Sequence, residues 1–169
     1  AAGQLLSVSA FYKRLRDPIE SNIISGSTAA SKSMSFINAE GAEVAGVELE
    51  LRHDLSFINA SPFWKNLMFT ANTALIKSEV MFDNPVTILN KRPLQGQSPY
   101  MINAGFQYSA PKSGWQANLL YNRIGRRLAI VGFGRYVNGN FAADYPDIYE
   151  APRDLLDLQL AKTLIANKA

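Results

Sequence analysis

Residues 98–122 contain two runs of alternating side chains joined by a short turn, and no other stretch constrains the fold as strongly. In each run every second side chain is apolar, which is the period of a β-strand. The apolar positions are Tyr100, Ile102, Ala104, Phe106 and Tyr108 in the first run and Trp115, Ala117, Leu119 and Tyr121 in the second. Pro111 and Gly114 mark the connection. The stretch therefore predicts a β-hairpin with one apolar and one polar face.

The polar face of this hairpin carries mostly uncharged amides, whereas a soluble β-sandwich usually places charges on its wet face. Aromatic residues stand towards the ends of the apolar face, where the interfacial girdles of a membrane protein would lie. These residues are Tyr100, Tyr108, Trp115 and Tyr121. Alternation over about ten residues per strand, with lipid outside and water inside, is the signature of a membrane β-barrel.

The same alternation recurs along the chain and predicts six strands in all. They span residues 4–14, 34–53, 67–79, 98–108, 115–131 and 154–164. The second strand contains Gly41 and Gly46, either of which predicts a bulge or a close backbone approach. Three long connections without sustained periodicity, predicted to be solvated loops, are Arg16–Met34, Met81–Gln97 and Gly132–Pro152. They alternate with a shorter connection at Asp54–Asn66 and a short turn at Pro111, as in outer-membrane barrels.

Composition excludes several other classes of protein. The net charge of +3 comes from scattered basic residues, which argues against a nucleic-acid partner. The absence of cysteine excludes disulfides and cysteine-based metal or redox chemistry, and it is compatible with export. No stretch approaches the roughly 20 apolar residues that a spanning helix needs. His53 is the only histidine, so histidine-based triads and metal clusters are not expected.

Two polar clusters remain as candidate sites. Asp144, Asp147 and Glu150 could bind calcium or an extracellular ligand, although their spacing does not fit an EF-hand and a plain surface loop is the alternative. Gly125-Arg126-Arg127 could attract an anion or a lipopolysaccharide phosphate, or form a charged strand end beyond the hydrocarbon. We predict no catalytic residue, no metal and no cofactor.

Six strands are fewer than the eight or so with which single-chain outer-membrane barrels begin, so we expect part of a larger barrel. Five segments in this order resemble the late barrel strands of TonB-dependent outer-membrane receptors. The segments are Ser7–Lys13, Asp17–Glu20, Asn38–Glu50, Leu94–Gly105 and Pro152–Lys162. Among these receptors, the sequence is most similar to those that carry a carboxypeptidase-regulatory-like domain ahead of the plug.

The resemblance implies a 22-stranded barrel around a plug domain. It implies import of a siderophore, cobalamin, an oligosaccharide or a peptide across the bacterial outer membrane, with energy relayed by TonB, and no enzyme activity. Residues 1–169 would be part of a single outer-membrane β-barrel domain, an all-β, antiparallel transmembrane segment of about six strands. The plug and the closing strands are expected to be missing from this sequence.

The expected partners are outer-membrane lipid, the protein's own plug and remaining barrel strands, TonB through the missing N-terminal part, and an unidentified extracellular ligand. Glu48, Glu50 and Arg52 share one strand face and could contact a substrate or the plug, or could belong to a solvated lumen wall. The residues predicted to face the lumen are Glu48, Glu50, Arg52, Asn72, Asn103, Gln107, Gln116, Asn118, Asn122, Asp157 and Gln159.

Two other readings of the pattern stay open. A soluble antiparallel β-sandwich or lipocalin-like ligand-binding module would also have paired polar and apolar faces, but it must bury the apolar face within the chain itself. A passive porin or an enzyme in a small outer-membrane barrel is the second alternative. An enzyme needs a nucleophile and a base in the lumen, which a lone histidine does not favour.

Overall fold

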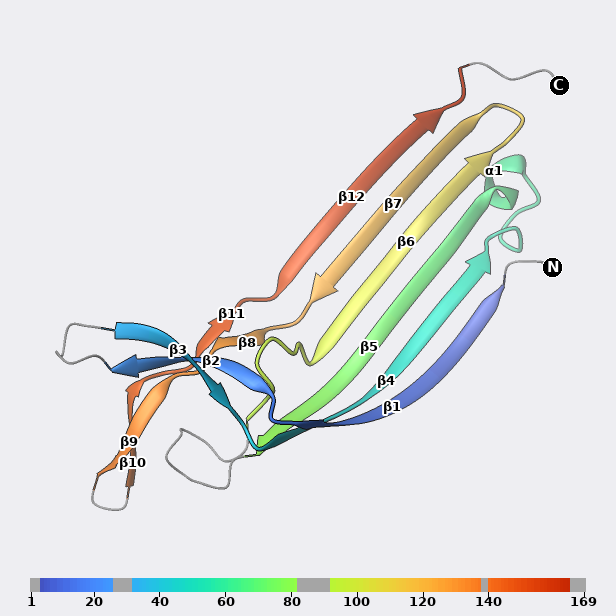
Figure 1. Cartoon of the computed structure of the whole chain (residues 1–169). Helices are drawn as coiled ribbons and strands as arrows, with labels where there is room; N and C mark the ends of the chain where they lie inside the picture. The colour runs from blue at the N-terminus through green and yellow to red at the C-terminus, as the bar shows by residue number, and fades with distance from the viewer. Residues whose placement is uncertain (1–3, 26–31, 82–91, 138–139, 165–169) are drawn as a thin grey trace.

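The structure, a computed structural model, describes residues 4–25, 32–81, 92–137 and 140–164. Six long strands form one antiparallel sheet in the order β1-β4-β5-β6-β7-β12 (Figure 1). Their bounds are β1 (Leu5–Arg16), β4 (Gly41–Asp54), β5 (Leu67–Met81), β6 (Tyr100–Ala110), β7 (Trp115–Ile124) and β12 (Arg153–Lys162). The predicted six-stranded antiparallel sheet is confirmed.

An unbroken register places the predicted apolar side chains on one face of the sheet. Because side chains alternate along each strand, residues that are paired across strands share a face. One such row of successive partners is Leu6, Leu51, Ala71, Ala104, Tyr121 and Leu156. Among the described elements only the one-turn helix at residues 62–65 lies on this face, at one end of it, and Val8, Leu75 and Leu158 are 68%, 60% and 67% exposed. A soluble sandwich or lipocalin-like module would bury these side chains, so the structure does not support that alternative.

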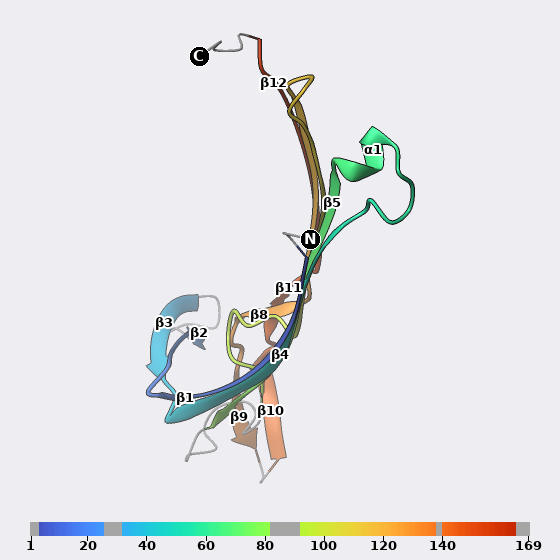
Figure 2. The same ribbon diagram turned by 90° about the vertical axis from the view of Figure 1, so that its right-hand side faces the viewer.

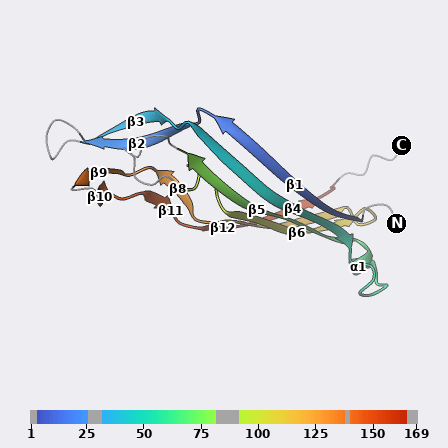
Figure 3. The same ribbon diagram turned by 90° about the horizontal axis from the view of Figure 1, so that it is seen from below.

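Three pairs of short strands extend from one end of the curved, single-layered sheet (Figures 2 and 3). The pairs are β2 (Ile19–Ser25) with β3 (Lys32–Asn38), β8 (Arg127–Ile130) with β11 (Ile148–Glu150), and β9 (Phe133–Val137) with β10 (Asn140–Tyr145). Arg16–Met34 and Gly132–Pro152, predicted to be solvated loops without periodicity, therefore contain regular strands in their described residues, and in this respect the prediction is wrong. A two-stranded ribbon is joined through its backbone and need not bury a continuous face, so it leaves little alternation in the sequence.

Two predicted strands are each divided in the structure. Residues 34–53 contain the end of β3 and most of β4, separated at Ala39 and Glu40, and residues 115–131 contain β7 and β8, separated at Gly125 and Arg126. The predicted connection Asp54–Asn66 includes a one-turn helix, α1 (Pro62–Lys65). Among the described residues no helix is long and apolar enough to cross a lipid bilayer.

Long and short connections lie at opposite ends of the sheet, as predicted (Figure 1). The β1–β4, β5–β6 and β7–β12 connections are long, and residues 82–91 of the predicted loop Met81–Gln97 lie outside the described part. The β6–β7 turn is short and closes when the Ala110 carbonyl accepts the Gly114 N–H at 2.8 Å. Gly114 has φ +73°, a conformation that glycine adopts without strain.

Gly46 lies on the polar face at a position that has no room for a side chain. Phe11, an apolar residue on that face of β1, is paired with Gly46 and lies against it. A methyl group at Gly46 would lie 2.6 Å from Phe11 Cζ and 2.8 Å from the Leu75 carbonyl oxygen. The β1–β4 and β4–β5 registers are continuous here, so the glycine serves a close approach and not a bulge.

Gly46→Ala is expected to lower the free energy of unfolding by about 1–3 kcal/mol, because the methyl group meets both an aromatic ring and a backbone oxygen. Urea unfolding of the detergent-folded protein measures this. Gly41→Ala is the matched control in the same strand, since its methyl group would meet the flexible end of Met81 at 3.3 Å and the Leu15 carbonyl oxygen at 3.4 Å. Equal effects of the two substitutions would contradict the close-approach explanation.

Candidate functional site

The register places every residue predicted to face the lumen on the polar face of the sheet. Glu50 pairs with Asn72, Asn72 with Asn103, and Asn103 with Asn122, so one row crosses four strands. The other predicted residues follow from the same ladders: Arg52 opposite Thr70, Glu48 opposite Ala74, Gln107 opposite Asn118, Asn118 opposite Gln159, Gln116 opposite Ser109 and Asp157 opposite Leu120. The sheet thus gathers residues that are distant in sequence into one polar wall.

Amide side chains on this wall hydrogen bond across neighbouring strands. Asn122 Nδ2 donates to Asn103 Oδ1 at 2.6 Å, and Asn118 Nδ2 donates to Gln159 Oε1 at 3.1 Å. Each amide has further donor and acceptor capacity beyond its one cross-strand bond. These amides can therefore exchange hydrogen bonds with a hydrated solute without presenting a fixed charge.

A shallow groove of about 290 Å³ lies on the wall and is bordered by both amide and charged groups. Its polar lining comprises Glu50, Arg52, Thr70, Asn72, Asn103 and Gln107. Arg52 Nε lies 2.9 Å from Met68 Sδ, and Ser9 Oγ donates to Glu48 Oε2 at 3.4 Å. Within the described residues, Glu48, Glu50 and Arg52 form no ion pair with one another or with a neighbouring strand. Their charges remain available to a solute or to another part of the protein.

In contrast to these unpaired charges, the long connections contain a fully buried ion pair. Arg92 donates from both terminal nitrogens to the two carboxylate oxygens of Glu20, with Nη1 to Oε1 at 2.9 Å. The side chains of Arg92 and Glu20 are 2% and 0% exposed. The backbone N–H of Gln95 adds a third hydrogen bond to Glu20 Oε1 at 3.1 Å. Hydrogen bonds to both charged groups offset part of the cost of burying them.

Gln95 joins the three long connections to one another. Its side-chain amide donates to the Ala129 carbonyl at 2.6 Å, and its Oε1 accepts the Ser21 N–H at 2.7 Å. Backbone hydrogen bonds run in parallel, from Ile23 N–H to the Val131 carbonyl and from Gly96 N–H to the Leu128 carbonyl. The side chains buried below are mainly apolar: Ala39, Ala42, Val80, Leu128 and Val131. The connections therefore form one packed unit, which we call the loop base.

Sequence reasoning missed the loop base because its residues show no period. Glu20 and Arg92 lie 72 positions apart, and each occurs in a stretch of mixed polarity. The only sequence signal is indirect: Gln95 and Ser98 belong to the segment Leu94–Gly105, one of those that carry the family resemblance. Nothing in that segment by itself identifies Glu20 as the partner of Arg92.

The described side chains of the other polar clusters do not come together as a binding site. The Asp144 side chain lies outside the described residues, Asp147 Oδ1 accepts the Gly132 N–H at 2.9 Å, and Glu150 pairs with Arg127 at 2.7 Å. No group of potential metal ligands occurs in the described part of the chain. His53 Nδ1 lies against the Asp54 carbonyl and its ring packs edge-on against Phe57.

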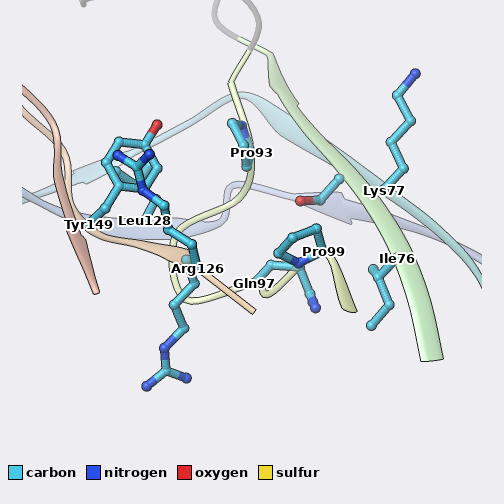
Figure 4. Close-up of a pocket in the computed structure, with 10 residues that line it drawn as sticks. Ile76, Lys77, Pro93, Gln97, Pro99, Arg126, Leu128 and Tyr149 are labelled. Atoms are coloured by element: carbon cyan, nitrogen blue, oxygen red, sulfur yellow. The ribbon is translucent and has the colours of Figure 1, made fainter. Parts of the chain in front are cut away.

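The basic pair near Gly125 borders a cavity of about 200 Å³ (Figure 4). The Arg126 guanidinium lies 3.9 Å from the centre of the Tyr149 ring, while Arg127 is held by Glu150. Figure 4 shows the Lys77 side chain extending away from Tyr149. The positive charges around the cavity do not converge, so the geometry does not support an anion site there.

Arg92→Met is expected to destabilise the loop base by about 3–5 kcal/mol, because it leaves the Glu20 carboxylate buried without its partner. Hydrogen exchange at the amides of Ile23 and Gly96 measures this local stability. The double variant Glu20→Met/Arg92→Met should recover most of the loss, since it removes both charges.

Arg127→Met is the control for this experiment. Its partner Glu150 is 44% exposed at the side chain, so the loss should stay within about 1 kcal/mol. If the amides of Ile23 and Gly96 exchange as slowly in the Arg92→Met variant as in the Arg127→Met variant, the buried pair does not hold the loop base together.

Comparison with known proteins bears on the whole chain. Residues 1–165 match the model of a protein family described as TonB dependent receptor-like, beta-barrel. No curated protein and no solved structure matches the chain.

Proposed function

The chain belongs to the TonB-dependent receptor-like β-barrel family, and from this premise we propose that it forms part of the barrel wall of a receptor that imports a scarce nutrient. The family is one of transporters, not of enzymes, and its members reside in the bacterial outer membrane. The family also implies a plug domain and an interaction with TonB in general. The proposal adds that residues 1–169 belong to a single barrel domain whose polar wall lines the lumen.

The single observation that carries this proposal is the separation of two faces on one uncovered sheet. The apolar face is exposed over several strands and suits lipid, while the polar wall suits water. Among the described residues β1 and β12 each pair with a strand on one side only. Unpaired backbone groups in lipid cost several kcal/mol each, so in a membrane both edges require further strands. A larger barrel supplies them.

The arrangement supports a path for the solute. Long connections of outer-membrane barrels face the cell exterior, which would place the loop base where ligand is first met. Its buried network favours a preformed entrance, so less ordering is needed on binding. Once the plug is remodelled, the amide row from Asn72 to Asn122 can exchange weak hydrogen bonds with the passing solute. Glu50 and Arg52 would contact the solute or the plug.

The assignment of the two faces can be tested with single cysteines, because residues 1–169 contain none and any cysteine elsewhere in the receptor can be replaced by serine. In the intact receptor in membranes, Asn118→Cys is expected to react with a charged, water-soluble maleimide, whereas the neighbouring Leu119→Cys should react only with a lipid-soluble reagent. Asn103→Cys and Ala104→Cys form a second matched pair on the adjacent strand. Equal labelling of both members of each pair would show that the sheet does not separate water from lipid.

Active import can be tested by growth. Deletion of the gene is expected to abolish growth on one limiting nutrient among iron chelates, cobalamin, oligosaccharides and peptides, and deletion of TonB should have the same effect on that nutrient. The mechanism predicts this because the plug must be remodelled with energy from TonB. Growth that depends on the gene but not on TonB would favour a passive porin.

A further inference from the structure

The end of the sheet with short connections has a groove that the transport path does not use. It lies between the β4–β5 connection and the β6–β7 turn and has a volume of about 620 Å³. Its lining includes Pro62, Lys65, Asn66, Tyr108, Lys112 and Ser113. We propose that this groove binds an anionic phospholipid, with Lys112 and Lys65 at the phosphate and the Tyr108 side of the groove against the acyl chains. The inference rests on the proposed outer-membrane location.

The groove opens on the apolar face of the sheet. Tyr108 is paired with Leu67 and Ala117 and therefore shares that face. The Phe63 ring of α1 stacks on Tyr108 with centroids 5.5 Å apart, so α1 is held on the same side. Figure 2 shows α1 standing off one side of the sheet, while β2 and β3 fold towards the other. The groove is thus continuous with the surface proposed to contact lipid.

Both walls of the groove are held in place by hydrogen bonds to backbone carbonyl groups. Asn66 N–H donates to the carbonyls of Pro62 and Phe63, and the Asn66 carbonyl accepts the Ser109 N–H at 3.0 Å. On the other side, Lys162 Nζ donates to the Ser113 carbonyl and lies 5.0 Å from the centre of the Trp115 ring. The site is therefore built before any ligand binds.

The charge around the groove is positive and uncompensated. Lys65 and Lys112 are exposed, and within the described residues neither has an ion-pair partner. Asp54 is the one acidic side chain in the two short connections; the register puts it on the polar face, and its carboxylate accepts Gln4 Nε2 at 2.8 Å. An anionic group is the ligand that this arrangement complements.

The apolar surroundings decide the class of that anion. Phe63, which stacks on the lining residue Tyr108, is 52% exposed, and an exposed aromatic ring is unfavourable in water. Aromatic side chains at an interface, next to basic residues that reach the headgroup level, are the usual pattern of lipid contact. A ligand with both a phosphate and acyl chains matches the whole site, whereas free phosphate would match only the lysines.

The test uses the intact receptor reconstituted into phosphatidylcholine vesicles with and without phosphatidylglycerol, followed by native mass spectrometry of the retained lipid. Lys112→Gln is expected to retain about fivefold less phosphatidylglycerol, the factor for one basic group near an anionic lipid surface. Lys65→Gln/Lys112→Gln should lose about twenty-fivefold, with retained phosphatidylcholine unchanged. Lys112→Arg should preserve binding.

Lys77→Gln is the matched control, since Lys77 lies on the same sheet face at the opposite end. Lys65 also borders a groove on the polar face, so the effect of replacing it does not identify which groove holds the lipid. The Lys112→Gln variant therefore tests the proposed groove by itself. Unchanged retention in Lys112→Gln, a loss in Lys77→Gln as large as in Lys112→Gln, or displacement of the lipid by inorganic phosphate would each overturn the proposal. Vesicle flotation is recorded in parallel, because failure to insert would refute the outer-membrane function instead.

Discussion

Backbone hydrogen bonding is the constraint on which this structure depends, because a strand in lipid has no water to satisfy its N–H and C=O groups. The ladders run through all six long strands without a register shift. A slip of one residue in any strand would move its amides and charges to the lipid face. The Phe11 ring packs over Gly46, and the register between β1 and β4 is continuous at this point.

The two ends of the sheet satisfy polar groups in different ways. At the end with long connections, Glu20 and Arg92 are removed from water and are satisfied by each other and by Gln95. At the end with short connections, Lys65 and Lys112 remain exposed beside aromatic rings. A buried pair favours one arrangement of the loops over others, whereas exposed lysines keep their charge available for a ligand. The chemistry therefore suits a fixed entrance and a lipid-facing base.

Transport across such a wall requires binding that is weak at each step. The row from Asn72 to Asn122 offers neutral amides, and each hydrogen bond to a solute replaces one to water at little net gain. The groove at Glu50 and Arg52 adds charge, as do Glu48 and Asp157 elsewhere on the wall. Substrate choice would then belong to the connections and the loop base, and the wall would serve many solutes equally.

Alternation in the sequence determined the six strands, the two faces and the membership of the polar wall. The period of two belongs to each strand by itself, and pairing only brings the strands into register. Asn103 and Gln107 could be placed from their neighbours alone. The Glu20–Arg92 pair, the strands β2, β3 and β9–β11, and the groove between Lys65 and Lys112 were decided only by the tertiary structure. These features join residues through long-range contacts, and such contacts leave no repeating pattern along the chain.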